Sequence, residues 1–183
     1  MGLFLRPSAW LLRWPQAMPA GGRALDVACG SGRHVHHLVD RGMQVSGIDR
    51  DAAATAPLQG IAEIINADIE NGDWPLAARQ FDLVLVSNYL WRPLLPKLLA
   101  AVAPGGWLIY ETFADGQQSI GRPARPDFLL QPAELLSACS ALRIVAFEDG
   151  FAEGRYVQRI AAVRPAEPAL LYPRYALDTS GIE

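Results

Sequence analysis

The stretch DVACGSGRH, residues 26–34, decides the fold. A short apolar run precedes it and a helical pattern follows it, with Gly30 and Gly32 at the junction. Glycine lets a backbone turn sharply and approach a bound molecule closely. A strand, a glycine turn and a helix in this order form the opening unit of a ligand-binding α/β sheet. The stretch therefore predicts such a unit, with Asp26 at the end of its strand.

The bulk composition predicts one domain. The chain has 183 residues, of which 51% are hydrophobic, enough for a single core over 1–183. We expect 1–22 to be an N-terminal capping segment and 164–183 a surface tail. Lys and Arg number 16 against 19 Asp and Glu, so no overall positive field favours nucleic acid.

Cysteine usage and hydropathy bear on the compartment. The 2 cysteines are too few for a disulfide framework, which favours a reducing cytoplasm. No apolar run approaches the roughly 20 residues of a membrane span, so we expect no membrane association.

From residue 23 onward, short apolar runs alternate with helical stretches, which is typical of a mostly parallel sheet. We expect strands at residues 24–28, 44–48, 62–66, 81–87, 106–112, 142–148 and 156–163. We expect helices at residues 8–14, 33–41, 50–56, 93–102 and 132–139. The last two strands are joined by DGFAEGR, 149–155, which is too short for a crossover helix and predicts an antiparallel hairpin.

Three carboxylates recur at predicted strand ends. Asp26, Asp49 and Asp68 each lie at or near the carboxyl end of a strand. In a parallel sheet these ends meet at one edge, where open α/β folds bind ligands. Any one of the three, taken alone, is equally well explained as a turn former or a helix cap.

Two ligand classes compete for this edge. A dinucleotide fingerprint requires a third glycine, and Val35 occupies that position. A pyrophosphate is also an anion, poorly matched to Asp26. S-adenosylmethionine instead carries a sulfonium and an ammonium that suit a carboxylate, and its own carboxylate suits a helix N-terminus and Arg33.

The sequence resembles the class I S-adenosylmethionine-dependent methyltransferases. The matching motifs are LDVACGSGRH, VSGIDRD, INADIENGDWPL, FDLVLVSNYLW and LAAVAPGGWLIYETF, in the family's order over residues 23–113. The first two motifs are similar to those of the small tellurite-resistance and thiopurine-type members. The resemblance implies a Rossmann-like α/β fold with a seven-stranded, mostly parallel sheet, helices on both faces and S-adenosylhomocysteine as the product.

The resemblance also implies roles by position. Asp49 would accept hydrogen bonds from both ribose hydroxyls, and the stem of Arg50 would cover the adenine. Asp68 and the backbone N–H of Ile69 would contact the adenine edge. Ala28 stands where the family usually has glycine, which implies less room under the methionine part. The remaining implied cofactor contacts are Asp26, Cys29, Gly30, Gly32, Arg33 and His34 around the methionine part, and Ser87 or Asn88 near the transferable methyl.

Candidates for the acceptor side follow the fourth and fifth strands, and they are Tyr89, Trp91, Arg92, Glu111, Arg122 and Arg125. Each has a structural alternative, either core packing for the aromatic residues or a solvated surface for the charged ones. The loop 116–130 is long enough to close over the site and to present Arg122 or Arg125 to an anion. No catalytic base is assigned.

A metal site is not expected. His34, His36 and His37 are close in sequence, but only 34 and 37 share a helical face. We expect Cys29 to be a wall residue rather than a nucleophile.

Three functional hypotheses remain open. The first is an enzyme that methylates a small molecule. The second is an RNA methyltransferase, because such enzymes need not carry the Asn/Asp-Pro-Pro-aromatic motif of many nucleic-acid N-methyltransferases, where this chain has SNYLW. The third is a protein that binds the cofactor or acts as a scaffold without catalysis. An NAD(P) oxidoreductase is opposed by Val35.

Overall fold

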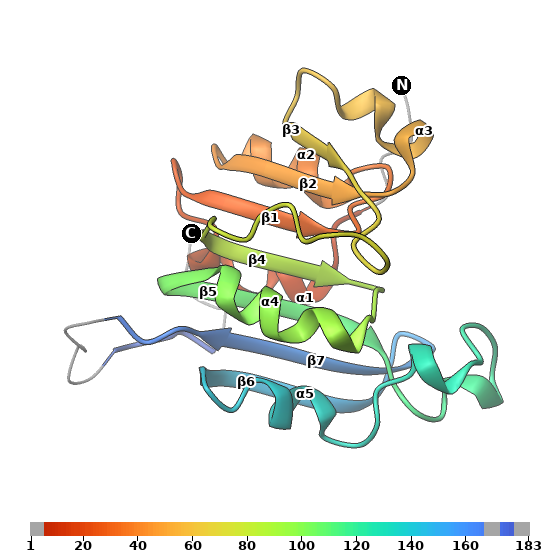
Figure 1. The fold of residues 1–183 in the computed structure, drawn as a ribbon. Coiled ribbons are helices and arrows are strands. Elements are labelled where there is room, and N and C mark those ends of the chain that lie inside the picture. Colours follow the sequence, from red (N-terminus) through yellow and green to blue (C-terminus); the bar gives the residue numbers. More distant parts are fainter. Residues whose placement is uncertain (1–5, 167–172, 178–183) are drawn as a thin grey trace.

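The computed structural model describes residues 6–166 and 173–177. A seven-stranded sheet runs through it in the order β3-β2-β1-β4-β5-β7-β6 (Figure 1). The strands are β1 Arg23–Val27, β2 Gln44–Asp49, β3 Glu63–Asn66, β4 Phe81–Ser87, β5 Val102–Phe113, β6 Arg143–Ala152 and β7 Arg155–Val163. The first five are paired in parallel, and β7 lies antiparallel between β5 and β6. The predicted fold class is confirmed, including the antiparallel hairpin.

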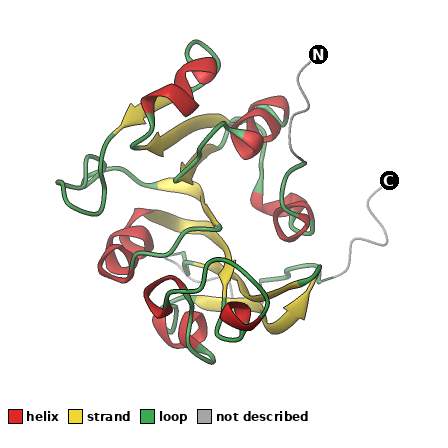
Figure 2. Cartoon of the chain, turned by 90° about the vertical axis from the view of Figure 1, so that its right-hand side faces the viewer, coloured by secondary structure: helices red, strands yellow, loops and turns green. Residues whose placement is uncertain are grey.

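The helices cover both faces of the sheet (Figure 2). They are α1 Ala9–Leu12, α2 Arg33–Asp40, α3 Ala52–Thr55, α4 Leu95–Ala101 and α5 Glu134–Ala138, with short 3-10 helices η1 Pro15–Ala17, η2 Ala56–Leu58, η3 Arg92–Leu94, η4 Gln117–Ser119 and η5 Pro126–Phe128. Side chains alternate along a strand, so β4 contributes to two core layers. Leu83 and Leu85 pack with residues of α1 and α2, while Val84 and Val86 pack with residues of α4 and α5.

Several predicted boundaries were wrong for local reasons. The predicted helix 50–56 begins later, as α3, because Asp51 is its N-cap and accepts hydrogen bonds from the N–H groups of Ala53 and Ala54. The predicted helix 93–102 is shortened at both ends. Strand β5 begins at Val102, because Val102 pairs with Phe81 before a shift in register, and the APGG segment, residues 103–106, lies within the strand.

The hairpin is also longer than predicted. Strands β6 and β7 continue into the segment that was expected to be a loop, and only Glu153 and Gly154 separate them. Both residues have positive φ, +54° and +77°, which matches the two-residue turns that suit the twist of a hairpin.

The N-terminal segment packs into the core layer on the α2 side. In place of one helix over 8–14 the chain forms α1 and η1, with Ser8 accepting a hydrogen bond from the N–H of Trp10 at 3.1 Å. Trp10 and Trp14 are buried and pack edge to face, with ring centroids 5.3 Å apart. Residues 1–5 of the predicted capping segment lie outside the described part of the chain.

The predicted tail is described in part. Tyr175 packs edge to face on Trp107 at 5.3 Å, and Gln16 donates a hydrogen bond to the Ala176 carbonyl at 3.0 Å. Residues 167–172 and 178–183 lie outside the described part. None of the described helices is long and apolar enough to cross a membrane.

Candidate active site

The sheet reverses its order between β1 and β4, and their carboxyl ends point to the right in Figure 1. Strand β2 ends at the same edge. Open α/β sheets bind ligands at this kind of switch point. Asp26, Asp49 and Ser87 lie at this edge, as the sequence predicted.

The two glycines of the turn after β1 have different roles. Gly32 has φ +82°, and a Cβ there would approach a Leu58 methyl at 2.3 Å, so glycine allows α2 to pack on the η2 segment. Gly30 has φ +52°, and a Cβ there would meet no atom within 4 Å. The backbone at Gly30 therefore faces open space. Ala28 also has a left-handed φ of +54°, a conformation that glycine adopts without strain.

Asp49 links the first two predicted motifs. Its carboxylate accepts one hydrogen bond from the N–H of Gly30 at 2.8 Å and another from the N–H of Asp51 at 2.9 Å. A carboxylate offers about four acceptor positions, so two remain free for other donors.

A cavity of about 200 Å³ lies next to Asp49, and its lining residues are Ala28, Asp49, Arg50, Ala67, Asp68, Ile69, Glu70 and Tyr89. Five of these were predicted cofactor contacts. Tyr89 was predicted on the acceptor side, and the structure places it in this cavity instead. Burial, together with the nearby Glu70 carboxylate, raises the pKa of Tyr89. Ala67 and Glu70 were missed, although both flank Asp68 in the third motif.

Asp68 also forms a turn. One of its oxygens accepts hydrogen bonds from the N–H groups of Glu70 and Asn71, and the other accepts one from the Asn71 side chain. These bonds lower the pKa of Asp68. The turn-former alternative thus describes Asp68 correctly, and the residue lines the cavity as well.

A buried polar pair lies under the glycine turn. Asp26 and His34 are both buried, with Nδ1 of His34 3.8 Å from Oδ1 of Asp26. His34 Nε2 accepts a hydrogen bond from the N–H of Ser8 at 3.2 Å, which assigns the ring proton to Nδ1. The other oxygen of Asp26 has no partner among the described residues. Burial and the two nearby carboxylates raise the pKa of Cys29 to about 12, so its thiol stays protonated and unreactive at neutral pH.

The carboxyl end of β4 holds the predicted methyl-side residues. Arg33 donates a hydrogen bond to the Ser87 hydroxyl at 2.8 Å. Asn88 has a left-handed φ of +56°, and its N–H donates to the Glu111 carbonyl at 2.9 Å. Its side-chain oxygen accepts a hydrogen bond from Arg155 at 3.4 Å. Arg155 was not predicted, because only the hairpin geometry brings it here.

Glu111 is not an exposed strand-end glutamate. It is 3% exposed, accepts a hydrogen bond from the Ser8 hydroxyl at 2.7 Å, and lies 2.6 Å from Nε of Arg159. The second contact is an ion pair whose N–H is not aligned as a hydrogen bond. Arg159 is also buried and has two further acidic neighbours, Glu148 at 3.6 Å and Glu153 at 3.4 Å. Both oxygens of the Glu111 carboxylate are therefore in contact with other side chains of the protein.

The side chains of Arg92 and Trp91 both make contacts within the protein. Arg92 pairs with Glu134 through two nitrogens at 2.6 and 2.9 Å, and it also donates to the carbonyls of Asp127 and Leu129. It therefore fastens the loop 116–130 to α5. Trp91 packs, half-buried, against the core.

The predicted loop arginines differ in their contacts. The carbonyl of Arg122 accepts a hydrogen bond from Gln117 at 3.1 Å. Arg125 is exposed, pairs with Asp127 at 2.9 Å and lies 5.1 Å above the Phe128 ring. Backbone bonds close the loop at its base, where Asp115 donates to Leu130 and Leu130 donates to Phe113.

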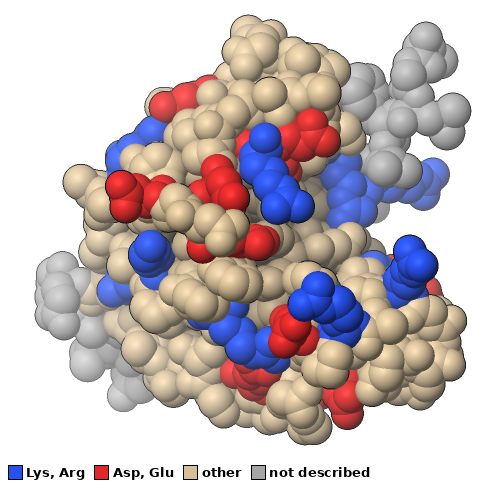
Figure 3. All heavy atoms as spheres, turned by 45° about the vertical axis from the view of Figure 1, so that its right-hand side comes forward, with Lys and Arg blue, Asp and Glu red and all other residues tan. Residues whose placement is uncertain are grey.

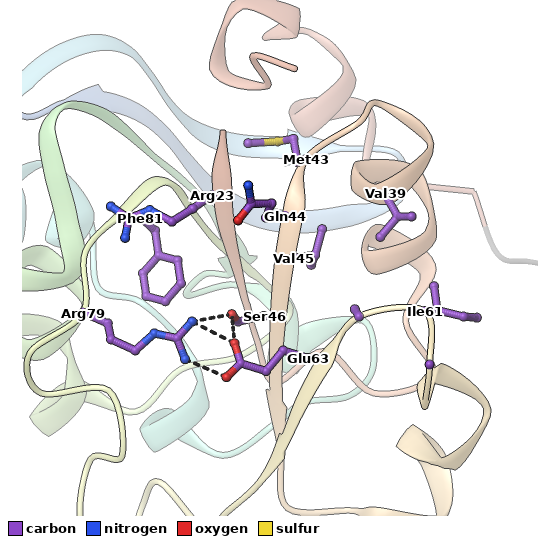
Figure 4. Close-up of a pocket in the computed structure, with 12 residues that line it drawn as sticks. Arg23, Val39, Met43, Gln44, Val45, Ser46, Ile61, Glu63, Arg79 and Phe81 are labelled. Atoms are coloured by element: carbon purple, nitrogen blue, oxygen red, sulfur yellow. Dashed lines mark hydrogen bonds and ion pairs between the residues drawn. The ribbon is translucent and has the colours of Figure 1, made fainter. Parts of the chain in front are cut away.

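A larger cavity of about 470 Å³ lies at the opposite edge of the sheet, near the starts of β1, β2 and β4. Arg79 donates to both oxygens of Glu63 and to the Ser46 hydroxyl there (Figure 4). The bonds from Arg79, together with one that the Ser46 hydroxyl donates to Glu63, lower the pKa of Glu63. They fix the segment between β3 and β4 to the sheet, and the cavity is remote from the carboxyl edge.

Comparison with known proteins agrees with this geometry. Residues 24–106 match the family described as methyltransferase domain. A SAM-dependent methyltransferase from Methanosarcina mazei aligns with a TM-score of 0.69 and 16% identity, covering 89% of this chain and 100% of that one. The chain has the class I methyltransferase fold. TehB from Haemophilus influenzae aligns with a TM-score of 0.66 and 15% identity, over 85% of this chain and 61% of that one.

Sequence relatives carry the same family name. A ubiquinone biosynthesis O-methyltransferase from Burkholderia multivorans is 35% identical over 104 residues, which is 51% of this chain and 45% of that protein. The chain thus spans about half the length of the curated relatives it matches. The domain match covers residues 24–106, less than half of the chain, and the solved neighbours share its fold, so both agree with the predicted resemblance to SAM-dependent class I methyltransferases.

Proposed function

We propose that this methyltransferase fold transfers a methyl group from S-adenosylmethionine to a small molecule and leaves S-adenosylhomocysteine. The observation that carries the proposal is the Asp49 carboxylate. It closes the glycine turn through Gly30 and lines the cavity beside β2, and it keeps two acceptor positions. A ribose with two hydroxyl donors fits that acceptor.

The other residues of the cavity fit an adenosine. The stem of Arg50 and the ring of Tyr89 supply apolar walls, and Asp68 and Ile69 supply an acceptor and a backbone N–H for the adenine edge. A compact cavity with apolar walls and a few polar groups is the common form of such sites.

The region under the glycine turn fits the methionine part. The unpartnered oxygen of Asp26 is an acceptor for an ammonium, and the open backbone at Gly30 permits close approach. Arg33 is a donor for a carboxylate. Ala28 and Cys29 form small walls beside them, and His34 holds Asp26 from behind.

The chemistry that the cofactor supplies is an electrophilic methyl carbon on a sulfonium. Bound S-adenosylmethionine would give up this carbon to the lone pair of the acceptor, and sulfur would keep the electron pair of the broken carbon–sulfur bond. The proton of the acceptor would pass to solvent. The chain contributes alignment at the end of β4, through Ser87 and Asn88, and such alignment supplies much of the rate in a displacement at an activated carbon.

A small molecule is favoured over RNA by the charge of the site face. Figure 3 turns the carboxyl edge toward the viewer, and acidic and basic side chains are interspersed there rather than gathered into one basic surface. The chain carries a net charge of −3, which gives little attraction for a polyanion. An RNA acceptor and a non-catalytic scaffold remain the alternatives.

Calorimetry with S-adenosylhomocysteine and with NADH tests the cofactor. We expect binding of the first and none of the second, and preferential binding of NADH would overturn the assignment. A radiolabelled methyl donor offered with phenols, thiols, amines and bulk RNA then tests the acceptor. Transfer to RNA alone would support the RNA alternative, and binding without transfer to any acceptor would support the scaffold.

A further inference from the structure

Two guanidinium groups reach the carboxyl end of β4 from opposite directions. Arg33, the first residue of α2, donates to the Ser87 hydroxyl at 2.8 Å. Arg155, the first residue of β7, donates to the side-chain oxygen of Asn88 at 3.4 Å. Ser87 and Asn88 are adjacent in the chain, so both cations lie where the proposed methyl transfer occurs.

Arg155 reaches this position across the end of β5. The last pair between β5 and β7 is Phe113 with Val157, so Arg155 starts beyond the end of that ladder. Its guanidinium lies over the Phe113 ring, 5.8 Å from the centroid, and continues to Asn88. The side chain is 28% exposed, which leaves it accessible and partly shielded from water.

The charge of Arg155 is only loosely compensated. The carboxylate nearest to it is Glu153 at 3.3 Å, and Glu153 is 54% exposed and also lies 3.4 Å from Arg159. Arg92, in contrast, has two short bonds to one carboxylate at 2.6 and 2.9 Å. The contacts of the Arg155 nitrogens with Asn88 and Glu153 are both long, so donors of its planar guanidinium group are available to a ligand.

The residue that Arg155 contacts has a left-handed backbone, which asparagine adopts more readily than most residues. Asn88 has a left-handed φ of +56°, although it is not glycine, and its N–H is fixed by the Glu111 carbonyl. With this backbone conformation, the Asn88 amide is directed toward Arg155 at the edge of the sheet.

We propose that Arg155, lying over Phe113, binds an anionic group of the methyl acceptor, either a carboxylate or a phosphate. The proposal rests on the proposed function for the identity of the acceptor. A guanidinium matches both oxyanions with paired donors, while the face of Phe113 holds the fork in place. Arg33 is then the guanidinium group that would bind the carboxylate of the cofactor. Arg155 thereby takes the role that the sequence suggested for Arg122 or Arg125.

Binding of simple anions tests this assignment without any turnover. Benzoate and phenyl phosphate are titrated calorimetrically at low ionic strength, with benzyl alcohol as the neutral probe, in the presence and absence of S-adenosylhomocysteine. We expect the anions to bind and benzyl alcohol to bind much more weakly. Arg155→Gln should weaken anion binding at least tenfold, Arg155→Lys should restore part of it, and neither should change S-adenosylhomocysteine affinity.

Arg125→Gln is the matched control. Arg125 also lies over a phenylalanine ring, at 5.1 Å, and also pairs with a carboxylate two residues away, Asp127. Its replacement should leave anion binding unchanged. Equal losses in the two glutamine variants would show a general surface-charge effect and would overturn the proposal.

The two proposals fail in different ways. Absence of S-adenosylhomocysteine binding with Arg155-dependent anion binding would refute the cofactor and leave the anion site. Normal S-adenosylhomocysteine binding without anion binding, or with anion binding that Arg155→Gln does not affect, would refute the anion site alone.

Discussion

Replacing Asp49 with alanine tests the proposed cofactor site most directly. The substitution removes the carboxylate that is assigned to the two ribose hydroxyls. A hydrogen bond to a charged group contributes about 1.5 kcal/mol or more, so losing two costs about 3 kcal/mol. Since each 1.4 kcal/mol is a factor of ten, affinity for S-adenosylhomocysteine should fall by about a hundredfold.

The same substitution has a structural cost that must be separated from the loss of binding. Asp49 holds the N–H groups of Gly30 and Asp51 at 2.8 and 2.9 Å. The Gly30 bond is part-buried. Leaving a buried donor unpaired costs about 1–3 kcal/mol, so the free energy of unfolding should fall by an amount in that range.

Asp51→Ala provides a control of similar structural cost. The Asp51 side chain caps α3 by accepting from the N–H groups of Ala53 and Ala54, both at 3.0 Å. Losing such a cap costs about 0.5–2 kcal/mol of stability. The backbone N–H that Asp51 donates to Asp49 is retained, and so are the free lone pairs of Asp49.

Urea unfolding and calorimetry with S-adenosylhomocysteine are measured on both variants. The expected pattern is a comparable loss of stability in the two, with the hundredfold loss of affinity confined to Asp49→Ala. Equal losses of affinity would mean that disruption of the turn, rather than ribose contacts, explains the result. An Asp49→Ala protein that binds within twofold of the parent would refute the reasoning.

Two further predictions concern the backbone conformation of Ala28 and the pH dependence of the stability that Glu63 contributes. Ala28→Gly should raise the unfolding free energy, because relief of a left-handed φ of +54° gains about 1–2 kcal/mol and the entropy of glycine costs about 0.5–1 kcal/mol. Ala24→Gly in the interior of β1 is the control and should be destabilising, so equal destabilisation of both proteins in urea would contradict the prediction. Glu63→Gln should be less stable than the parent at pH 7, because the bonds from Arg79 and Ser46 lower the pKa of Glu63 in the folded state. A lowered pKa contributes stability at pH values above the unfolded-state pKa, and that stability is lost as pH falls through the folded-state pKa. The difference in unfolding free energy between parent and variant should therefore shrink by pH 3. A difference that stays constant with pH in urea titrations would argue against the prediction.

The parts of the site that the sequence predicted depend on local pattern. The alternation of a strand, a glycine turn and a carboxylate after a strand are each recognised within a few consecutive residues. A parallel sheet then brings successive strand ends to one edge without further information. For this reason Asp26, Asp49 and Asp68 were placed correctly relative to the sheet, and the helix starts at Arg33 and near Asp51 were close.

The parts that the sequence missed depend on contacts between distant segments. Glu111 is bound by Ser8, 103 residues away, and Arg92 is bound by Glu134, 42 residues away. No local sequence pattern distinguishes a charged side chain that is buried or ion-paired from one that is exposed. Arg155 was missed for the same reason, since it lies 67 residues after Asn88 and approaches it only because of where the hairpin turns.

A continuous set of polar contacts connects the two halves of the site. Asp26 faces His34, His34 accepts from the Ser8 backbone, and the Ser8 hydroxyl donates to Glu111, which is paired with Arg159. All five are buried, so each polar group depends on its neighbour for compensation, and removal of one leaves a buried group unpaired. The segment around Ser8 therefore holds the end of β1, where the cofactor is proposed to bind, in a fixed relation to β5 and β7, where the acceptor is proposed to bind. Such a frame suits a displacement reaction, whose rate depends on the distance and the angle between two separately bound molecules.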